Sequence, residues 1–328
     1  MQHQYPEISV VIPVKNEVAK IKACLDGILS QTIPVKEIIV VDSGSTDGTL
    51  EILNQYKEVT LIEIPSKEFN HGATRNLGVQ YTTGEFVVLT VGDAKPCNNT
   101  WIEELLKGFV DEEVAGVCGQ QVVPHDLDKN PVEWFRPLSE PEIIRYQFSN
   151  EAFEVLSPQE KKKICGWDDV TAMYRKSVLD KLPFRATSFA EDAQWAKDVL
   201  LGGYGIVYNY HARVYHYHLE NPQFTYSRTF TVLYHLHKFF NYLPDIPSYS
   251  IIDSLKLIKL LLWEKKVKPI QKLKWFKYNL EQRRNFMKAV KDFLIAAGKG
   301  NEAIEFAHQK IAATPPIPVK QSARSLYE

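Results

Sequence analysis

The first half of the chain alternates short β-branched apolar runs with stretches of helical periodicity, and this alternation limits the possible folds more than any other feature. The expected strands are Ile8–Ile12, Glu37–Val41, Thr60–Ile64 and Glu85–Thr90. The expected helices between them are Val18–Leu29 and Thr49–Tyr56. Such alternation is typical of an α/β fold with a mostly parallel central sheet and helices on both faces. Because ligands bind beyond the carboxyl ends of such strands, the loops after Ile12, Val41 and Thr90 are expected to share one crevice.

The pattern changes twice further along the chain. Residues 124–165 carry five prolines and give no clear assignment. Around this segment we expect one helix, Glu191–Leu201, and the strands Ala115–Val123, Val170–Tyr174, Ile206–Tyr208 and Val214–His218. After about residue 222 the patterns are helical, over Phe224–Phe240, Ile251–Trp263, Ile270–Leu294 and Asn301–Ala312. We therefore expect two domains, residues 1–222 and residues 223–328.

Composition excludes several classes of protein. Of the 328 residues, 45% are apolar and 24% are charged, which allows a large core and argues against disorder. The net charge of −1 is not that of a generic nucleic-acid-coating protein. The four cysteines are widely spaced and form neither a zinc signature nor a disulfide framework. With a polar start and no apolar run near the ~20 residues of a membrane span, a cytoplasmic protein is expected.

The C-terminal region has a basic, amphipathic character. Residues 251–298 contain 12 Lys and Arg against 4 Asp and Glu, a surplus of eight positive charges. Ile251, Leu255, Ile258 and Leu262 fall at helical spacing among lysines. This is the pattern of a helix lying on a membrane surface, here the inner membrane face. It equally fits a helix packed on the core with a solvated basic face, or a dimer interface.

Three strand ends carry polar residues suited to binding a ligand. Pro13, Asn16 and Glu17 follow the first strand, where backbone can approach a base or ribose. Asp42 stands at the tip of the second strand, where its carboxylate can accept hydrogen bonds from a base or ribose. Asp93 follows the Glu85–Thr90 strand, a place suited to a divalent cation that bridges a diphosphate. The simpler reading of Asp93 is an ordinary loop aspartate.

Taken together, these motifs resemble the family 2 glycosyltransferases, which have the GT-A fold. The resemblance spans roughly residues 6–220 and rests on the opening Pro-x-x-Asn-Glu and on residues 41–49 (Val-Asp-Ser-Gly-Ser-Thr-Asp-Gly-Thr). Residues 69–76 (Phe-Asn-His-Gly-Ala-Thr-Arg-Asn) resemble the rhamnosyltransferase branch, whose donor is dTDP-rhamnose. The resemblance implies a transferase that uses a nucleotide-sugar to build cell-surface polysaccharide.

The resemblance also implies roles on the donor side. Pro13, Asn16, Glu17 and Asp42 fall in the donor-binding positions. Arg75 falls in the segment that lines the donor phosphates, which suit a guanidinium, although an ion pair within the protein is the alternative.

Asp93 matches the family's metal-binding carboxylate, which would hold Mg²⁺ or Mn²⁺. The usual Asp-x-Asp is absent here, because Ala94 and Lys95 follow Asp93. His216 and His218 are candidates for the missing ligand, since side chains two apart on a strand share a face. Either histidine could equally be structural, and the sequence gives no basis for choosing between them.

The segment Phe189–Trp195 resembles the family's Glu-Asp motif at a helix start. A carboxylate in the Asp192 position acts as general base, because the acceptor hydroxyl must lose its proton as it attacks. Glu191 is the competing candidate, and helix capping is the simpler role for Asp192. The acceptor side is expected to hold aromatic and charged residues, namely Trp167, Asp168, Asp169, Tyr174, Arg175 and Trp195, although Trp167 could equally be a core residue.

The function expected from the sequence is an inverting glycosyltransferase, with L-rhamnose as the sugar and a saccharide or lipid-linked hydroxyl as the acceptor. A UDP-hexose or UDP-N-acetylhexosamine transferase is the alternative within the family. The second alternative is a protein that binds a sugar nucleotide without catalysing transfer. Its best support is the incomplete metal-binding motif at Asp93. A nucleotidyltransferase ranks low, since residues 14–17 lack a glycine-rich basic loop.

Overall fold

The computed structural model describes residues 5–134, 140–187 and 189–312. The chain forms two compact units. Within the described residues, the first unit comprises residues 5–122 and 140–216, and the second comprises residues 123–134 and 217–312. The sequence had suggested a division near residue 222 and had placed residues 123–134 in the first domain.

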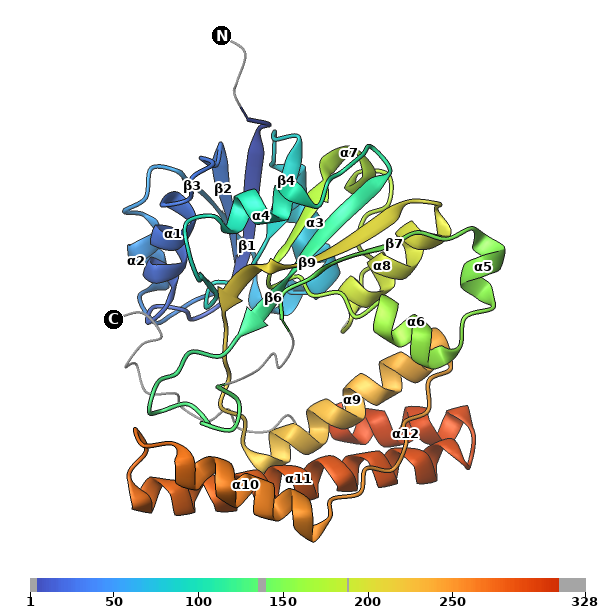
Figure 1. Cartoon of the computed structure of the whole chain (residues 1–328). Coiled ribbons are helices and arrows are strands. Elements are labelled where there is room, and N and C mark those ends of the chain that lie inside the picture. The colour runs from blue at the N-terminus through green and yellow to red at the C-terminus, as the bar shows by residue number, and fades with distance from the viewer. Residues whose placement is uncertain (1–4, 135–139, 188, 313–328) are drawn as a thin grey trace. The chain divides into compact units, whose positions relative to one another are not determined.

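The first unit is built on a nine-stranded sheet with the order β3-β2-β1-β4-β8-β6-β9-β5, with β7 paired to β9 (Figure 1). The strands are β1 (Ile8–Val14), β2 (Glu37–Asp42), β3 (Val59–Glu63), β4 (Phe86–Leu89), β5 (Lys95–Pro96), β6 (Val114–Val122), β7 (Ile143–Tyr146), β8 (Ala172–Arg175) and β9 (Gly205–Tyr215). Strands β1 to β4 pair in parallel, as the sequence predicts, and β6 is parallel to β9. Strand β8 runs antiparallel between β4 and β6, so the sheet is mixed.

Helices cover both faces of this sheet. The helices of the first unit are α1 (Ile21–Leu29), α2 (Thr49–Leu53), the 3-10 turn η1 (Ser66–Glu68), α3 (His71–Gln80), α4 (Trp101–Lys107), α5 (Asn150–Glu154), α6 (Pro158–Ile164), α7 (Lys176–Leu179) and α8 (Glu191–Leu201). Ile8, Val10 and Ile12 of β1 share a core with α1 and α4. Val11 points to the opposite face, where a Cβ at Gly78 of α3 would lie 2.4 Å from its Cγ1. Glycine at this position therefore lets α3 pack closely on the sheet.

The parallel strands bring the predicted ligand-binding loops to one edge. In the register, Pro13 of β1 lies beside Val41 of β2, and Val11 lies beside Leu89 of β4. The three strands therefore end at the same edge, and the loops that carry Glu17, Asp42 and Asp93 follow from it. The first helix starts later than expected, at Ile21, because Asn16 adopts a left-handed conformation (φ 58°) and residues 18–20 form a turn.

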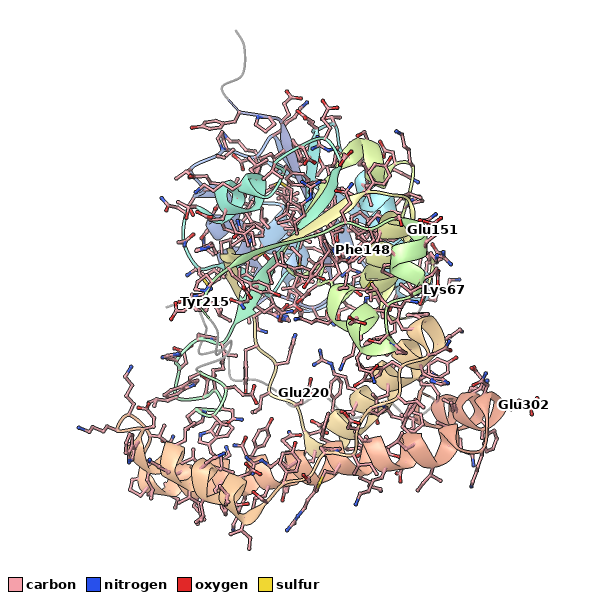
Figure 2. All side chains as sticks on the ribbon, turned by 45° about the vertical axis from the view of Figure 1, so that its right-hand side comes forward. Lys67, Phe148, Glu151, Tyr215, Glu220 and Glu302 are labelled. Carbon is pink, nitrogen blue, oxygen red and sulfur yellow. The ribbon has the colours of Figure 1, made fainter. Side chains whose placement is uncertain are left out.

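Strand β9 differs most from the expectation. One continuous strand, Gly205–Tyr215, replaces the two short strands predicted over Ile206–Tyr208 and Val214–His218. It ends at Tyr215, labelled in Figure 2, so His216 and His218 lie beyond the strand. The short strands β5 and β7 were not predicted, because two residues carry no periodicity and β7 is half-exposed within the proline-bearing segment.

The second unit is helical, with α9 (Pro222–Phe240), α10 (Ile251–Trp263), α11 (Pro269–Ala297) and α12 (Asn301–Ala312). Its positions agree with the four helices that the periodicity predicts, and the bounds of α10 and α12 are the expected ones. One core joins α9, α11 and α12 around Phe230 and Phe293. A second core joins Trp134 to Leu257 and Trp275, which explains why residues 123–134 belong to this unit. Within the described residues, no helix is long and apolar enough to cross a membrane.

Candidate active site

The loops at the sheet edge are held together by polar contacts. The carboxylate of Asp42 is buried at the end of β2, and its Oδ2 accepts the backbone N–H groups of Gly44 (2.8 Å) and Ser45 (2.9 Å). The Asn16 side chain accepts the N–H of Thr46 at 2.8 Å, and the Asn16 N–H donates to the Ser45 hydroxyl at 2.8 Å. These contacts fasten the loop after β1 to the loop after β2. Both loops carry residues that the sequence places on the donor side.

Glu17 and Asp93 interact electrostatically at this edge. Burial, together with the negative charge of Asp93, raises the pKa of Glu17 to about 8. The Glu17 side chain packs against Gly92, where an added Cβ would lie 3.1 Å from the Glu17 Cγ. Lys20 places its Nζ 3.0 Å from Asp93 Oδ2. Sequence reasoning missed Lys20, because the turn that brings it to Asp93 lies within the predicted helix.

Asp93 also faces the two histidines that the sequence singled out. His216 Nε2 lies 3.2 Å from Asp93 Oδ1. Asp93, His216 and His218 each offer one ligand atom, and these atoms lie within 4.8 Å of one another. The group persists although both histidines lie beyond β9, because the chain continues past the strand end toward the loop after β4. A carboxylate oxygen and imidazole nitrogens at this spacing fit a divalent metal ion.

A glutamine of β6 extends this group. The Gln121 Oε1 atom lies 2.6 Å from His216 Nδ1, and the Gln121 amide N–H donates to Asp168 Oδ2. The other oxygen of Asp168 accepts the N–H of Val170 at 3.0 Å. Gln121 therefore links the predicted metal-binding residues to a predicted acceptor-side carboxylate. No sequence signal pointed to Gln121, since it lies in no recognised motif.

A second cluster surrounds Arg75 of α3. Its Nη1 donates to Glu191 Oε1 at 2.5 Å and to the carbonyl oxygen of His71 at 3.2 Å. Its Nε lies 2.9 Å from Asp169 Oδ2. The side chains of Arg75, Asp169 and Glu191 are all buried. The guanidinium therefore makes the ion pairs that the sequence left as its alternative role, and contact with donor phosphates stays a prediction.

Asp192 lies in the first turn of α8, next to Glu191. Its side chain keeps a partly exposed face, and its Oδ1 accepts the N–H of Ala193 at 2.7 Å. Burial of the carboxyl raises the pKa of Asp192 well above its usual range, and the negative charges of Asp169 and Glu191 add to the effect. The helix starts directly after Ala190, which adopts a left-handed conformation (φ 57°). A carboxyl group with a raised pKa, close to other carboxyl groups, is a candidate for a functional site.

The two predicted acceptor-side tryptophans lie in an aromatic core. Trp167 donates its Nε1–H to the Tyr174 hydroxyl at 2.7 Å, and Trp195 donates to the carbonyl oxygen of Leu182 at 2.9 Å. Trp167 and Trp195 are only 4% and 1% exposed, and their ring centroids are 5.5 Å apart. Protein atoms therefore occupy the ring faces that the sequence assigned to a sugar. For Trp167 this is the core role that the sequence left open, and the geometry does not favour stacking by either residue.

Tyr174, which the sequence places on the acceptor side, connects this core to the buried carboxylates. Its hydroxyl donates to Asp169 Oδ1. Burial raises the pKa of Asp169 to about 7, with the charge of Glu191 adding to the effect and that of Arg75 opposing it. The structure thus brings Asp168, Asp169, Glu191 and Asp192 together. Pro13, Asn16, Glu17, Asp42 and Asp93 lie at or just beyond the ends of β1, β2 and β4. Gln121 connects Asp168 to His216, which lies beside Asp93.

Comparison with known proteins agrees with this arrangement. The model of a family described as glycosyl transferase family 2 matches residues 9–182. The O-antigen chain rhamnosyltransferase RfbN of Salmonella typhimurium is 32% identical over 230 residues, which cover 68% of this chain and 70% of that protein. The O-antigen chain rhamnosyltransferase WbaN of Salmonella anatum is 31% identical over 234 residues, covering 69% of this chain and 70% of that protein.

Solved structures show the same fold. A mannosyltransferase of Pyrobaculum calidifontis, solved in complex with GDP-Man and Mn²⁺, superposes with a TM-score of 0.52 at 21% identity. The match covers 96% of this chain and 82% of that one. The expectations of a GT-A fold and of a rhamnosyltransferase-like sequence are confirmed. The chain belongs to glycosyl transferase family 2, and it is a glycosyltransferase with the GT-A fold.

Proposed function

We propose that this glycosyltransferase moves L-rhamnose from dTDP-rhamnose to a hydroxyl of a saccharide or lipid-linked acceptor, with inversion at the anomeric carbon, in cell-surface polysaccharide synthesis. The names of the relatives RfbN and WbaN support the sugar and the process. The observation that carries the proposal is the position of Asp192, whose raised pKa suits proton abstraction, in the same unit as the Asp93–His216 group.

The chemical step assigned to the protein is proton removal. Asp192 takes the proton of the acceptor hydroxyl as that oxygen attacks the anomeric carbon. Attack from the face opposite the nucleotide gives a single displacement and inverts the anomeric centre. Arg75 holds Glu191 and Asp169 beside the base, which keeps the first turn of α8 in one orientation. The carboxylate of Glu191 is already paired with Arg75, so Glu191 is the weaker candidate for the base.

The donor is held at the sheet edge. Pro13, Asn16, Glu17 and Asp42 contact the nucleoside in this proposal. The loop contacts of Asn16 and Asp42 support it, because they fix the backbone that would face the ligand. Asp93, His216 and His218 would hold a divalent ion, which when bound supplies positive charge to the leaving diphosphate. Mixed carboxylate and imidazole ligands suit Mn²⁺ better than Mg²⁺, which prefers oxygen ligands and water.

A donor panel tests the proposal. Purified protein is incubated with dTDP-rhamnose, UDP-hexoses, UDP-N-acetylhexosamines and GDP-mannose, with Mn²⁺, Mg²⁺ or EDTA, and nucleotide release is measured. Release from dTDP-rhamnose supports the proposed sugar. Release from a UDP-sugar alone supports the alternative transferase of the same family. Failure both to release nucleotide from any donor and to bind any donor in calorimetry would favour a non-catalytic sugar-nucleotide-binding protein.

We further propose that the second unit contacts the inner membrane face. The supporting observation is a set of large apolar side chains that stay exposed on α10 and the start of α11, drawn as sticks in Figure 2. This apolar face consists of Ile251, Ile252, Leu255, Ile258, Leu262, Trp263, Ile270 and Leu273. Residues 251–277 also contain eight lysines against two acidic residues. Apolar side chains edged by lysines complement the anionic surface of a bilayer.

Vesicle co-sedimentation tests this contact. Binding to vesicles with anionic phosphatidylglycerol, and weak binding to neutral vesicles, is the expected result. Leu262→Gln together with Trp263→Gln should reduce binding. Phe306→Gln, which changes an equally exposed residue of α12, should not. Equal binding by all variants would contradict the membrane contact, and a concentration-dependent dimer that the double substitution abolishes would identify the face as a dimer interface.

A further inference from the structure

Four polar residues form a chain of contacts that starts at Asp168 and ends at Asp93. Gln121 donates its amide N–H to Asp168 Oδ2 and places its Oε1 2.6 Å from His216 Nδ1. The other ring nitrogen, His216 Nε2, lies 3.2 Å from Asp93 Oδ1. Asp93 and His216 are both largely buried. The order of these contacts determines where the imidazole carries its proton.

The orientation of the Gln121 amide is fixed at its Asp168 end. An ionised carboxylate only accepts hydrogen bonds, so Asp168 requires the NH₂ group of Gln121 on its side. The carbonyl oxygen of Gln121 therefore faces His216, and it too only accepts. At 2.6 Å the facing ring atom Nδ1 must carry the hydrogen, since two acceptors at that distance would repel each other.

In a neutral imidazole with this proton position, Nε2 carries an electron pair instead of a hydrogen. That electron pair points toward a carboxylate oxygen of Asp93, 3.2 Å away. Two acceptors that face each other are stabilised by a cation between them. Carboxylate oxygens and imidazole nitrogens both bind divalent metal ions, so these two facing atoms would suit a shared ion.

We propose that Gln121 is a positioning residue that holds His216 in its Nδ1–H tautomer and thereby prepares Nε2 to bind a divalent ion, with Asp168 setting the amide orientation. This inference rests on the metal site of the proposed function. Gln121 itself contacts neither the ion nor the sugar. Its amide group connects the predicted acceptor-side carboxylate Asp168 to the predicted metal ligand His216.

Nitrogen-15 NMR of the histidine side chains reads the tautomer without any metal. Spectra are recorded over a series of pH values, so that the neutral and the protonated forms of the ring can be told apart. A His216→Gln variant assigns the signal. The wild type should show Nδ1–H at His216. Gln121→Leu removes the acceptor at Nδ1, so the proton should move to Nε2, where Asp93 accepts it.

A control variant separates this effect from general damage to β6. Gln120→Leu changes the neighbouring residue, whose Oε1 accepts from Arg213 Nε at 3.2 Å, and it should leave the His216 signal unchanged. Titration with Mn²⁺ gives the second readout. Loss of an outer partner of a metal-binding histidine typically weakens metal binding by about 10–100-fold, which is the loss expected for Gln121→Leu.

The outcomes distinguish this inference from the proposed function. A wild-type protein with Nε2–H at His216, or a Gln121→Leu variant that keeps the wild-type tautomer, overturns the role of Gln121. A wild-type protein that shows Nδ1–H, loses it in Gln121→Leu and yet binds no Mn²⁺ supports the role of Gln121 in fixing the tautomer and overturns the metal site. Loss of both the tautomer and Mn²⁺ affinity in Gln121→Leu supports both.

Discussion

Arg75 Nη1 lies 2.5 Å from Glu191 Oε1, and this buried contact joins α3 to the first turn of α8. The residues are 116 positions apart in the chain. Because Asp192 follows Glu191 directly, the ion pair fixes the backbone that carries the proposed base. An arginine for which the sequence predicts either contact with the donor phosphates or an ion pair within the protein thus holds the first turn of α8 in place.

Replacing Arg75 tests this positioning role. Arg75→Met leaves Glu191 and Asp169 buried without their cation, and loss of one partner of a buried pair costs about 3–5 kcal/mol. The free energy of unfolding, measured by urea denaturation, should fall by that amount. Arg185→Met is a matched control. Arg185 also pairs with a carboxylate of α8, because its Nε lies 2.7 Å from Asp198 Oδ2, but this pair lies on the exposed surface. It should cost at most about 1 kcal/mol. Equal losses in the two variants would contradict the buried role.

Asp192→Asn removes the proposed base and keeps the shape of the side chain. Transfer to acceptor should fall by at least about 10²-fold, the lower bound for general base catalysis. Donor affinity in calorimetry should stay unchanged, because the nucleoside and diphosphate contacts lie at the sheet edge. Glu191→Gln is the comparison, and it should lower stability through Arg75 as well as activity. An Asp192→Asn protein with most of its transferase activity would exclude this residue as the base.

The raised pKa of Asp169 predicts how stability depends on pH. In the unfolded chain this carboxyl has the ordinary pKa of 3.8, whereas in the folded protein its pKa is about 7. Between these values the folded state holds a proton that the unfolded state releases. The free energy of unfolding therefore decreases as pH rises through this window, by up to about 1.4 kcal/mol per pH unit for this group.

Asp169→Asn should remove this contribution. The plot of unfolding free energy against pH between about 4 and 7 should then fall less steeply than in the wild type. Asp180→Asn, at an exposed carboxylate that pairs with Lys176, is the control and should leave the slope unchanged. The quantity to compare is the slope of unfolding free energy against pH. Loss of the contact with Arg75 would lower the unfolding free energy at all pH values and would not by itself change that slope. Parallel curves for wild type and Asp169→Asn would show that the carboxyl titrates normally.

Metal removal tests the Asp93 group. EDTA should abolish nucleotide release, and added Mn²⁺ should restore it. His216→Ala and Asp93→Asn should each weaken Mn²⁺ binding, because each deletes a ligand atom from the group. His211→Ala, at an exposed histidine of β9, should behave as the wild type. Activity in EDTA that equals the activity in Mn²⁺ would remove Asp93 and the histidines as metal ligands.

The sequence determined which residues end the parallel strands, and therefore which polar side chains lie at that edge of the sheet. Periodicity of two and of 3.6 residues is local, so β1, β2, β4, α8 and α10 could be predicted within a few residues. The strand-end motifs placed Asn16, Glu17, Asp42 and Asp93 at one edge, because parallel strands end together. The Glu191–Asp192 pair was found through its resemblance to a family motif.

Only the tertiary structure decided the partners of the buried polar groups. Arg75 meets Glu191, and Gln121 meets His216, across 116 and 95 positions of sequence respectively. The antiparallel insertion of β8 between β4 and β6 brings Asp168 and Asp169 to these groups, and nothing local in the sequence signals that insertion. The same packing buries Trp167 and Trp195. Charge and aromaticity thus show which residues can act, and the strand order decides which residues they meet.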